Sequence, residues 1–470
     1  MSRLRDLIEK IESNLERLLD THLCIGIAGL SQSGKTTFVT SLINQLENYQ
    51  QANLASFSPA LSGRLLGVKV HSLNHSGLAE FPYRAGLENL HSTPPKWPTP
   101  TTGSSGCLLE LRLKSTKSLN PLKRDVFSLF LEIRDYPGEW LLDLPLRNMN
   151  FARWSSQCSA QYQASPRHQI LGELYGELLQ IDPLADCDHA YLEQVFGRFV
   201  AFLKRCKNQG QALSLIQPGR FLLPGDTNLT ESSKLHFIPL LNCKNHSEES
   251  LKNAAKNSYY KVCEARYQHY VKTLVEPFYK EYFSKIDRQI VLVDVVQALN
   301  GGPNYLADMS QAMSNIMDSF AYGEQNRLLQ LFNPKIDKVM FAATKIDQVL
   351  SEDHDAVRQL LADVVRQAYA NAAHEGIEPE CEAIASVRAS RECDYQNERG
   401  LQGHNQKGQA IGYVHPRIPA RIPSHEQWQP FMDWKIPTLN PPKGLKDHNK
   451  ALPHIRLDIV LNYLIGDKCK

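Results

Sequence analysis

The stretch IGIAGLSQSGKTTF, residues 25–38, contains the pattern G-x-x-x-x-G-K-[ST], with Gly29, Gly34, Lys35 and Thr36 at its fixed positions. Residues 22–28 (HLCIGIA) are predicted to form a buried strand, and a helix is predicted from residue 35 to residue 46. Glycines in such a loop let backbone N–H groups point at a phosphate, and the helix N-terminus adds partial positive charge. The pattern therefore predicts a nucleotide site in an α/β fold.

The residue types of this phosphate loop suggest individual roles. Lys35 is expected to reach the β- and γ-phosphates, and the Thr36 hydroxyl is expected to bind Mg²⁺. The other loop residues expected to surround the phosphates are Ser31, Gln32, Ser33 and Thr37. A plain glycine- and serine-rich turn is the alternative, but the order of strand, loop and helix favours the nucleotide site.

The composition is that of a soluble globular protein. The 470 residues are 42% apolar and 22% charged, and the net charge of +2 gives no overall field that favours nucleic acid. The ten cysteines form no C-x-x-C pair, which favours reduced thiols. The first twenty residues do not resemble a signal peptide, and no apolar run approaches the ~18 residues that span a bilayer. We therefore expect a cytoplasmic protein without a transmembrane segment.

The first part of the chain is predicted to alternate helix, loop and strand. Residues 1–20 have apolar side chains at helical spacing and are predicted to form an amphipathic helix. We expect it to pack on the protein's own core, with peripheral contact to a membrane or a partner as the alternative. Residues 58–106 are predicted to be an irregular surface loop, because they end in STPPKWPTPTTGSSG, residues 92–106, here called the proline-rich loop. Two neighbouring strands are predicted at 107–113 and 126–133.

Residues 147–285, here called the helical block, have apolar residues at helical spacing, interrupted by the turn QPGRFLLPG at 217–225. Strands are predicted again at 289–296, 338–343 and 382–387, with helical stretches between them. This alternation indicates a mostly parallel sheet. Residues 399–440 are rich in Gly, Pro and His, and residues 452–465 are predicted to form a closing helix.

A second phosphate-site element follows the strand at 126–133. Asp135-Tyr136-Pro137-Gly138 fits D-x-x-G, in which the aspartate holds Mg²⁺ through a water and the glycine N–H binds the γ-phosphate. A simple type I turn is the alternative interpretation of the same four residues.

The base is predicted to be guanine. Thr344-Lys345-Ile346-Asp347 follows the strand at 338–343, and the Asp347 carboxylate can accept both the N1–H and the amino donors of guanine. The stem of Lys345 can lie over the ring, and Thr344 stands where asparagine is commoner. Ser386 and Val387 are expected to meet the guanine oxygen through a backbone N–H.

The proline-rich loop offers Thr99, Thr101 and Thr102 as candidates to close on Mg²⁺ and the γ-phosphate. Trp97 of the same loop is expected either to stack on a ring or to anchor the loop by burial. Three arginines of the helical block, Arg198, Arg205 and Arg220, form no obvious second phosphate site.

Four segments together resemble a known family: GLSQSGKT (29–36), IRDYPGEW (133–140), QPGRFLLPG (217–225) and TKID (344–347). They look like those of the P-loop GTPases, and in particular of the YcjX-like family of bacterial stress-associated GTPases, over essentially the whole chain. The resemblance implies a cytoplasmic GTP-binding protein whose G domain carries an inserted helical domain. It also implies a link to the phage-shock envelope-stress response and an unidentified protein partner or activator.

Glu139 follows the D-x-x-G element where many G proteins carry a glutamine that orients the attacking water. Its charge beside a γ-phosphate is unfavourable, so we expect it to be structural or ion-paired and turnover to be slow.

The sequence thus predicts a P-loop GTPase domain from residues 21–146 and 286–398, the inserted helical block at 147–285, and an extension at 399–470 that packs on the GTPase domain. The predicted reaction converts GTP and water into GDP and phosphate with Mg²⁺, as a conformational switch. The alternatives are an ATP- or GTP-dependent phosphotransferase and a scaffold that assembles with GTP.

Overall fold

The computed structural model describes residues 21–30, 32–73, 78–101, 103–116, 125–208, 212–223, 225, 232–321, 336–445, 447 and 450–470, without the side chains of 318–321. The predicted N-terminal helix, Ser31 and Thr102 lie outside these residues.

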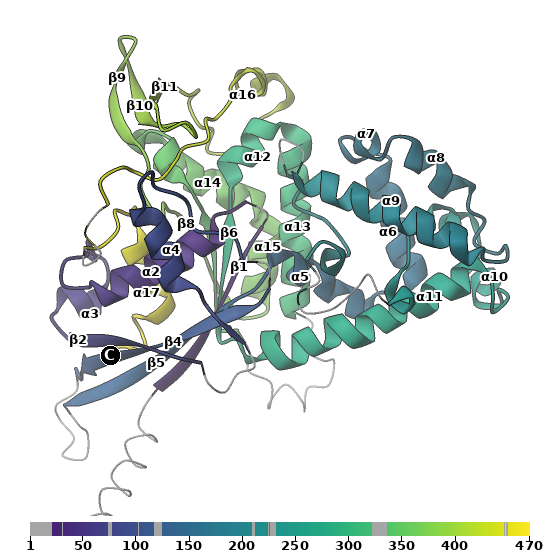
Figure 1. The fold of residues 1–470 in the computed structure, drawn as a ribbon, viewed down its shortest axis with the longest axis horizontal. Coiled ribbons are helices and arrows are strands. Elements are labelled where there is room, and N and C mark those ends of the chain that lie inside the picture. The colour runs from purple at the N-terminus through teal and green to yellow at the C-terminus, as the bar shows by residue number, and fades with distance from the viewer. Residues whose placement is uncertain are drawn as a thin grey trace, which may run out of the picture.

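One mixed sheet, mostly parallel, forms the centre of the molecule (Figure 1). β1 (Thr21–Gly29) lies between β5 (Val126–Asp135) and β6 (Arg288–Val293), and β7 (Lys338–Ala343) and β8 (Glu378–Ala383) follow in parallel. β4 (Ser105–Lys114) runs antiparallel to β5 and to β2 (Leu65–His71), and the short β3 (Ala79–Glu80) pairs with β4. The apolar run of β1 is buried on both faces, as a central parallel strand requires.

Helices cover both faces of this sheet. Leu23, Ile25 and Ile27 of β1 contribute to one apolar core with α2 (Lys35–Glu47) and α17 (Leu457–Ile465), near which α3 (Ser58–Leu61) and α4 (Tyr83–His91) also lie. Cys24 and Ala28 face the other core, because successive side chains of a strand alternate. That core includes residues of α12 (Val295–Gly301), α13 (Pro303–Ala321), α14 (His354–Val364) and α15 (Arg366–His374).

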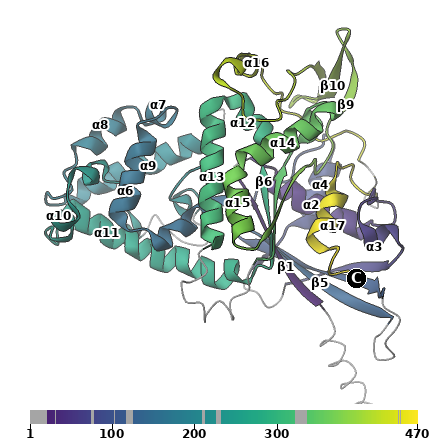
Figure 2. The same ribbon diagram turned by 180° about the vertical axis from the view of Figure 1, so that it is seen from behind.

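The helical block lies beside the sheet (Figures 1 and 2). It contains α6 (Phe151–Tyr162), α7 (Arg167–Leu171), α8 (Glu173–Gln180), α9 (His189–Asn208), α10 (Glu248–Lys252) and α11 (Tyr259–Tyr270), which continues in further helical turns to Lys285. Trp154, Phe237 and Tyr267 contact one another in its interior, with ring centroids 5.2 to 5.7 Å apart. These rings belong to the same apolar core as the adjoining face of the sheet, so the block and the sheet share one interior.

The C-terminal segment packs against the phosphate-loop helix. The Leu452 N–H donates to Asn44 Oδ1 at 2.7 Å, and Gln45 Nε2 donates to the Leu452 carbonyl at 2.8 Å. Arg288 at the start of β6 is fully buried and pairs with Asp467 Oδ1 at 2.6 Å and Asp337 Oδ1 at 2.9 Å. Residues 452–469 therefore contribute to the core beneath the phosphate loop.

The prediction of an irregular loop at residues 58–106 is wrong for most of its length. α3, β2, β3 and α4 lie there, and the longest described stretch without a helix or strand is residues 92–101. Turn-forming residues obscured two elements in the sequence: β2 is an edge strand that pairs with β4, and α4 packs closely on α2. A Cβ at Gly86 would lie 2.7 Å from Thr40 Oγ1, so this close helix contact depends on glycine.

Three boundaries also differ from prediction. The last strand of the sheet is β8 at 378–383 rather than 382–387, because its charged sequence EPECEA suits an edge strand but not an apolar pattern. β6 ends at Val293, and Asp294 caps α12 where we had predicted continued strand to 296. A separate three-stranded sheet of β9 (Arg391–Tyr395), β10 (Glu398–His404) and β11 (Ala410–Tyr413) precedes α16 (Gln429–Asp433), and the predicted boundary at 398/399 cuts it.

The closing helix is shorter than predicted, since α17 begins at Leu457 and residues 452–456 lie outside it, with Arg456 at φ +61°. Within the described part of the chain, no helix has the length and apolar character needed to cross a membrane.

Candidate functional site

A pocket of about 430 Å³ lies where the parallel strands end, the usual ligand position in open α/β sheets. It collects residues from the phosphate loop, the proline-rich loop, the D-x-x-G and TKID segments, the helical block and the C-terminal segment. The lining residues are Gly29, Leu30, Gln32, Ser33, Gly34, Lys35, Thr36, Thr37, Trp97, Pro98, Pro100, Thr101, Pro137, Gly138, Glu139, Lys207, Leu223, Thr344, Lys345, Asp347, Gln348, Ser386, Val387, Ala389, Thr438 and Leu439.

The phosphate loop has the backbone geometry of a cradle. Gln32 and Gly34 have φ values of +64° and +79°, which turn the chain just before α2 begins at Lys35. At Gly29 an added Cβ would lie 2.2 Å from Ser33 Oγ, so the loop closes on itself only with glycine there. The side chain of Thr36 is buried at the first turn of α2, where backbone N–H groups are free to bind an anion.

Lys35 joins the phosphate loop to the D-x-x-G element. Its Nζ lies 2.6 Å from Asp135 Oδ1 and donates to the Tyr136 carbonyl at 2.8 Å. The Asp135 side chain is fully buried, so the ammonium offsets a charge that water cannot reach. The register of β5 against β1, which sets Asp135 opposite Ile27, explains why these groups meet.

Gly138 lies against the phosphate loop itself. A Cβ at this position would come within 2.1 Å of the Gly29 carbonyl oxygen, a distance that no side chain tolerates. The D-x-x-G glycine is therefore needed for close approach of two backbones, and the simple-turn interpretation does not account for that approach.

Of the two candidate threonines that the structure describes, Thr99 and Thr101, only Thr101 reaches the site. Its Oγ1 donates to Asp135 Oδ2 at 2.8 Å, whereas Thr99 is exposed and outside the pocket lining. Trp97 lines the pocket, and its Nε1 donates to the Leu439 carbonyl at 2.8 Å, which ties the loop to the C-terminal segment. Stacking of Trp97 on a ring stays a prediction.

Asp347 is held in the pocket wall by its neighbours. The Ala389 N–H donates to Asp347 Oδ2 at 2.8 Å, and burial of the carboxyl raises its pKa to about 6. Ser386 and Val387 line the pocket beside it, and the Ser386 carbonyl accepts from Ser41 Oγ at 2.5 Å. The predicted base reader is thus a buried carboxyl facing a cavity.

Lys345 and Thr344 are oriented by the neighbouring strand. Lys345 adopts φ +61°, and its Nζ lies 2.7 Å from Asp294 Oδ2 at the end of β6. Thr344 Oγ1 lies 3.5 Å from the Val293 carbonyl and is almost fully buried. Sequence reasoning missed Asp294, which follows an apolar strand and carries no pattern of its own.

Glu139 is ion-paired, as predicted: its Oε1 lies 2.7 Å from Lys207 Nζ. Lys207 comes from α9 in the helical block and was missed, as were Leu223, Thr438 and Leu439. Each is distant in sequence from the motifs and has no local signal, so only the fold could bring them to the pocket.

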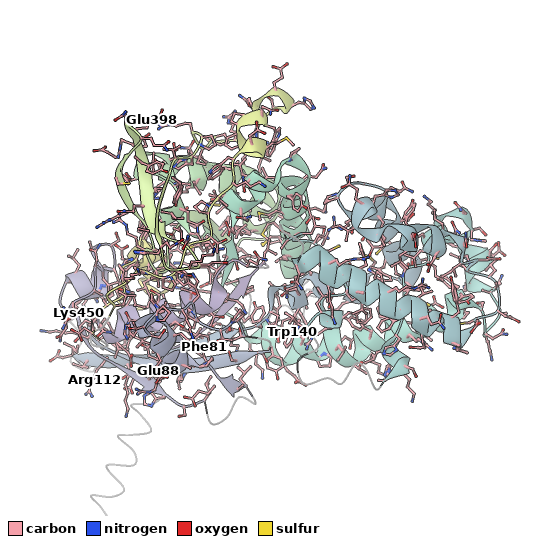
Figure 3. All side chains as sticks on the ribbon, turned by 45° about the horizontal axis from the view of Figure 1, so that its top comes forward. Phe81, Glu88, Arg112, Trp140, Glu398 and Lys450 are labelled. Carbon is pink, nitrogen blue, oxygen red and sulfur yellow. The ribbon has the colours of Figure 1, made fainter. Side chains whose placement is uncertain are left out.

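The turn at residues 217–223 holds α5 (Gly138–Asp143) in place. A Cβ at Gly219 would lie 2.1 Å from the Glu139 carbonyl oxygen, and the Gly219 N–H donates to Asp143 Oδ1 at 2.8 Å. The Arg220 guanidinium lies 3.3 Å from the ring centroid of Trp140. Figure 3 shows Trp140 at the junction of the sheet and the helical block. The helix after D-x-x-G is therefore in direct contact with the block.

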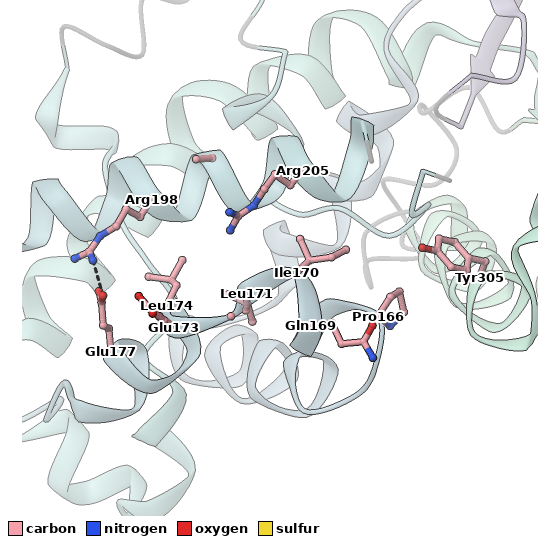
Figure 4. A pocket seen from close by; sticks show the side chains of 12 residues that line it. Pro166, Gln169, Ile170, Leu171, Glu173, Leu174, Glu177, Arg198, Arg205 and Tyr305 are labelled. Atoms are coloured by element: carbon pink, nitrogen blue, oxygen red, sulfur yellow. Dashed lines mark hydrogen bonds and ion pairs between the residues drawn. The ribbon is translucent and has the colours of Figure 1, made fainter. Parts of the chain in front are cut away.

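A second pocket, of about 890 Å³, lies within the helical block between α8 and α9 (Figure 4). Arg198 pairs there with Glu177 at 2.5 Å, Arg205 extends from the same helix, and Glu173 also lines the pocket. Arg220 lies elsewhere, over Trp140. The three arginines thus do not converge on one anion site.

The site residues also fit Mg²⁺. The Thr36 hydroxyl and the Asp135 carboxylate are hard oxygen donors, and Mg²⁺ in nucleotide sites takes few ligands from protein. Within the described ranges no group of three or more His, Cys, Asp or Glu side chains could hold a metal on its own. An ion at Thr36 and Asp135 would therefore take its remaining ligands from phosphate and water.

Known proteins resemble this chain over its length. The sequence profile of the YcjX-like family, DUF463, matches residues 23–469. A protein named Ras-like GTPase YcjX from Escherichia coli (strain K12) is 38% identical over 481 residues, covering 100% of both chains. Another of that name from Shewanella oneidensis is 34% identical over 480 residues, covering 99% of this chain and 98% of its own. These matches extend across all the segments that line the pocket.

Proposed function

Because this chain belongs to the YcjX-like family, we propose that it binds GTP with Mg²⁺ in this pocket and hydrolyses it to GDP and phosphate. The observation that carries the proposal is that Lys35 and Asp347 line one cavity, with Lys35 paired to the buried Asp135 directly behind it. In this proposal Lys35 binds phosphate, Asp135 binds the metal, and Asp347 binds guanine. We propose that this takes place in the cytoplasm.

The residues act by position and charge. When GTP binds, the Lys35 ammonium moves from Asp135 to the β- and γ-phosphate oxygens, and the Gly138 N–H donates to the γ-phosphate. Mg²⁺, when bound at Thr36 and Asp135, neutralises developing charge. Water oxygen bonds to the γ-phosphorus as the bond to the bridging oxygen breaks, that oxygen's electron pair stays on GDP, and the proton of the water passes to the released phosphate. Since Glu139 is paired with Lys207, its carboxylate is held away from the role of a base, and we propose that turnover is slow.

The proposed switch runs from the pocket into the helical block. The γ-phosphate orders the proline-rich loop through Thr101 and fixes Asp135 to Gly138. α5 begins at Gly138 and contacts the turn at 217–223, so a shift there changes how the block is presented to a partner. In this proposal residues 21–146 and 286–398 form the nucleotide domain and the block is its insertion. The family resemblance suggests envelope stress as the setting.

The first test is calorimetric titration of the purified full chain with GTP, GDP and ATP, each with Mg²⁺. We expect micromolar or tighter binding of both guanine nucleotides and no heat with ATP. Binding of ATP as tight as that of GTP would refute the guanine assignment and favour the phosphotransferase.

The two alternatives have less support. A phosphotransferase needs an acceptor site, but in the second pocket Arg198 is paired with Glu177, and Glu173 lies in the same lining as Arg205, so the lining carries no excess of positive charge. A GTP-dependent scaffold would increase in mass with nucleotide, which light scattering measures directly.

Guanine binding is expected to weaken in mild acid. Burial raises the pKa of Asp347 to about 6, so the carboxylate is ionised above this pH and protonated below it. Only the ionised form accepts both guanine donors, and affinity for GDP should fall by about tenfold per pH unit below about pH 6. Titrations between pH 5 and pH 8 measure this; an affinity independent of pH across that range would remove Asp347 from the base site.

Thr101→Val is expected to slow hydrolysis more than it weakens GDP binding. The hydroxyl that now donates to Asp135 is the group proposed to follow the γ-phosphate, which GDP lacks. We expect turnover to fall about 10- to 100-fold and GDP affinity to change by less than about threefold. Thr99→Val, at an exposed position, should slow hydrolysis much less in the same assay. An equal loss of turnover in both variants would argue against a specific role of Thr101.

A further inference from the structure

We propose that Lys207 is a catalytic residue that the helical block supplies in cis, with its ammonium directed at the γ-phosphate during GTP hydrolysis. The inference rests on the proposed function and adds to it the group that stabilises the transition state.

Lys207 lies in the last turn of α9 and reaches the nucleotide pocket from outside the sheet. It lines the same cavity as Gly34, Lys35, Thr36 and Gly138. Its ammonium lies 2.7 Å from Glu139 Oε1, next in sequence to the glycine whose N–H is proposed to bind the γ-phosphate. The ammonium is thus at the γ-phosphate end of the pocket, opposite the base reader.

The position of the ion pair explains why a cation is needed there. Glu139 is buried, and contact of its backbone with Gly219 holds it beside the phosphate loop. Alone, its carboxylate would repel a γ-phosphate, because like charges at short range in a buried site interact strongly. Lys207 cancels that charge, and its flexible four-carbon stem lets the ammonium bridge the carboxylate and a phosphate oxygen.

The proposed role requires no proton transfer. In a loose transition state the negative charge is spread over the γ-phosphoryl oxygens, and a fixed cation lowers its energy. Water still forms the new bond to phosphorus, and the β-phosphate still keeps the electron pair of the broken bond. An arginine supplied to such a site raises turnover by about 10³ to 10⁵-fold, and we expect a smaller factor, about 100-fold, from a lysine held partly by Glu139.

A merely structural pair would behave differently. If Lys207 only neutralised Glu139, removing both charges would restore activity, since no buried carboxylate would be left unpaired. If Lys207 acts on the γ-phosphate, removing both charges leaves the transition state without its cation. A double-mutant cycle therefore separates the two roles.

The experiment uses the full chain and compares wild type, Lys207→Met, Lys207→Arg, Glu139→Gln and the double variant Lys207→Met with Glu139→Gln. Lys204→Met, at an exposed position one turn earlier on α9, is the matched control. Single-turnover GTP hydrolysis gives the rate, and titration with GDP gives an affinity that does not depend on the γ-phosphate. Retained GDP binding also shows that each variant is folded. If Lys207→Met does not fold, Lys207→Gln is used in its place.

We expect Lys207→Met to be about 100-fold slower with GDP affinity within about threefold of wild type, and Lys207→Arg to keep most activity. The double variant should be as slow as Lys207→Met, and Lys204→Met should match wild type. Wild-type turnover in Lys207→Met, or its recovery in the double variant, would overturn the inference while leaving GTP hydrolysis intact. A wild-type chain that does not hydrolyse GTP would instead overturn the proposed function.

Discussion

Lys35→Ala is expected to reduce the affinity for GTP and GDP by a factor on the order of 10³ or more, because the charge that faces the β- and γ-phosphates is lost. The same substitution leaves the Asp135 carboxylate buried without its cation, hydrogen-bonded among the described residues by the hydroxyls of Thr101 and Ser105. Breaking a buried pair in this way costs about 3 kcal/mol of stability, so the variant should also melt at a lower temperature. Calorimetry with GDP and thermal unfolding measure the two effects separately.

The control for this prediction removes the stability effect alone. In Lys35→Ala combined with Asp135→Asn, the unpaired charge is gone, so the melting temperature should recover while nucleotide binding stays lost. Lys204→Ala, at an exposed position, should alter neither quantity. Binding of GDP by Lys35→Ala with wild-type affinity would show that the pocket does not use its glycine-rich loop for phosphate.

Asp347→Asn is expected to change the preferred base from guanine to xanthine. In the proposed binding mode the carboxylate accepts from N1–H and the amino group of guanine, whereas an amide presents an NH₂ donor, which suits the oxygen that xanthine has in place of that amino group. GTP affinity should fall about 10- to 100-fold, and the ratio of XTP to GTP affinity should rise by a factor on the order of 10³.

Asp347→Asn is also expected to leave the fold intact. Asparagine has the same size, and its amide oxygen can still accept the Ala389 N–H that now bonds to Asp347 Oδ2. Because burial raises the pKa of this carboxyl to about 6, a neutral side chain removes a desolvated charge and the variant should be no less stable. Competition of XTP and GTP against a fluorescent GDP analogue measures the ratio, with exposed Asp355→Asn as the control. An unchanged ratio would place the base elsewhere.

The local patterns of the sequence predicted the centre of the fold well. β1, the start of α2 and the pairing of β4 with β5 as neighbours are confirmed, and β7 has the predicted bounds of 338–343. These elements are apolar on both faces or joined to a loop of fixed pattern, so burial and local sequence agree. β8 and β2 were misplaced or missed because edge strands need burial on one face only, and their charged and glycine residues resemble a loop.

The sequence predicted only those pocket residues that belong to the recognised motifs or lie next to them. Lys35, Asp135 and Asp347 each follow a strand, and parallel strands bring their carboxyl ends to one edge. Lys207 and Leu439 reach the same cavity from the helical block and from the segment before α17, through tertiary contacts that no spacing encodes. Among the candidate threonines, only geometry separates Thr101, which bonds to Asp135, from Thr99, which does not line the pocket.

The contact of residues 452–469 with the phosphate-loop helix affects how the protein is made. The Leu452 N–H donates to Asn44 of α2, and Gln45 of α2 donates to the Leu452 carbonyl. The buried Arg288 is paired with Asp467. At synthesis rates of ~5–20 residues per second, this segment leaves the ribosome on the order of tens of seconds after the phosphate loop. Until then the core beneath the loop is incomplete and Arg288 lacks one of its carboxylates. The support of the phosphate-loop helix should therefore be complete only once residues 452–469 have been made and have packed on α2.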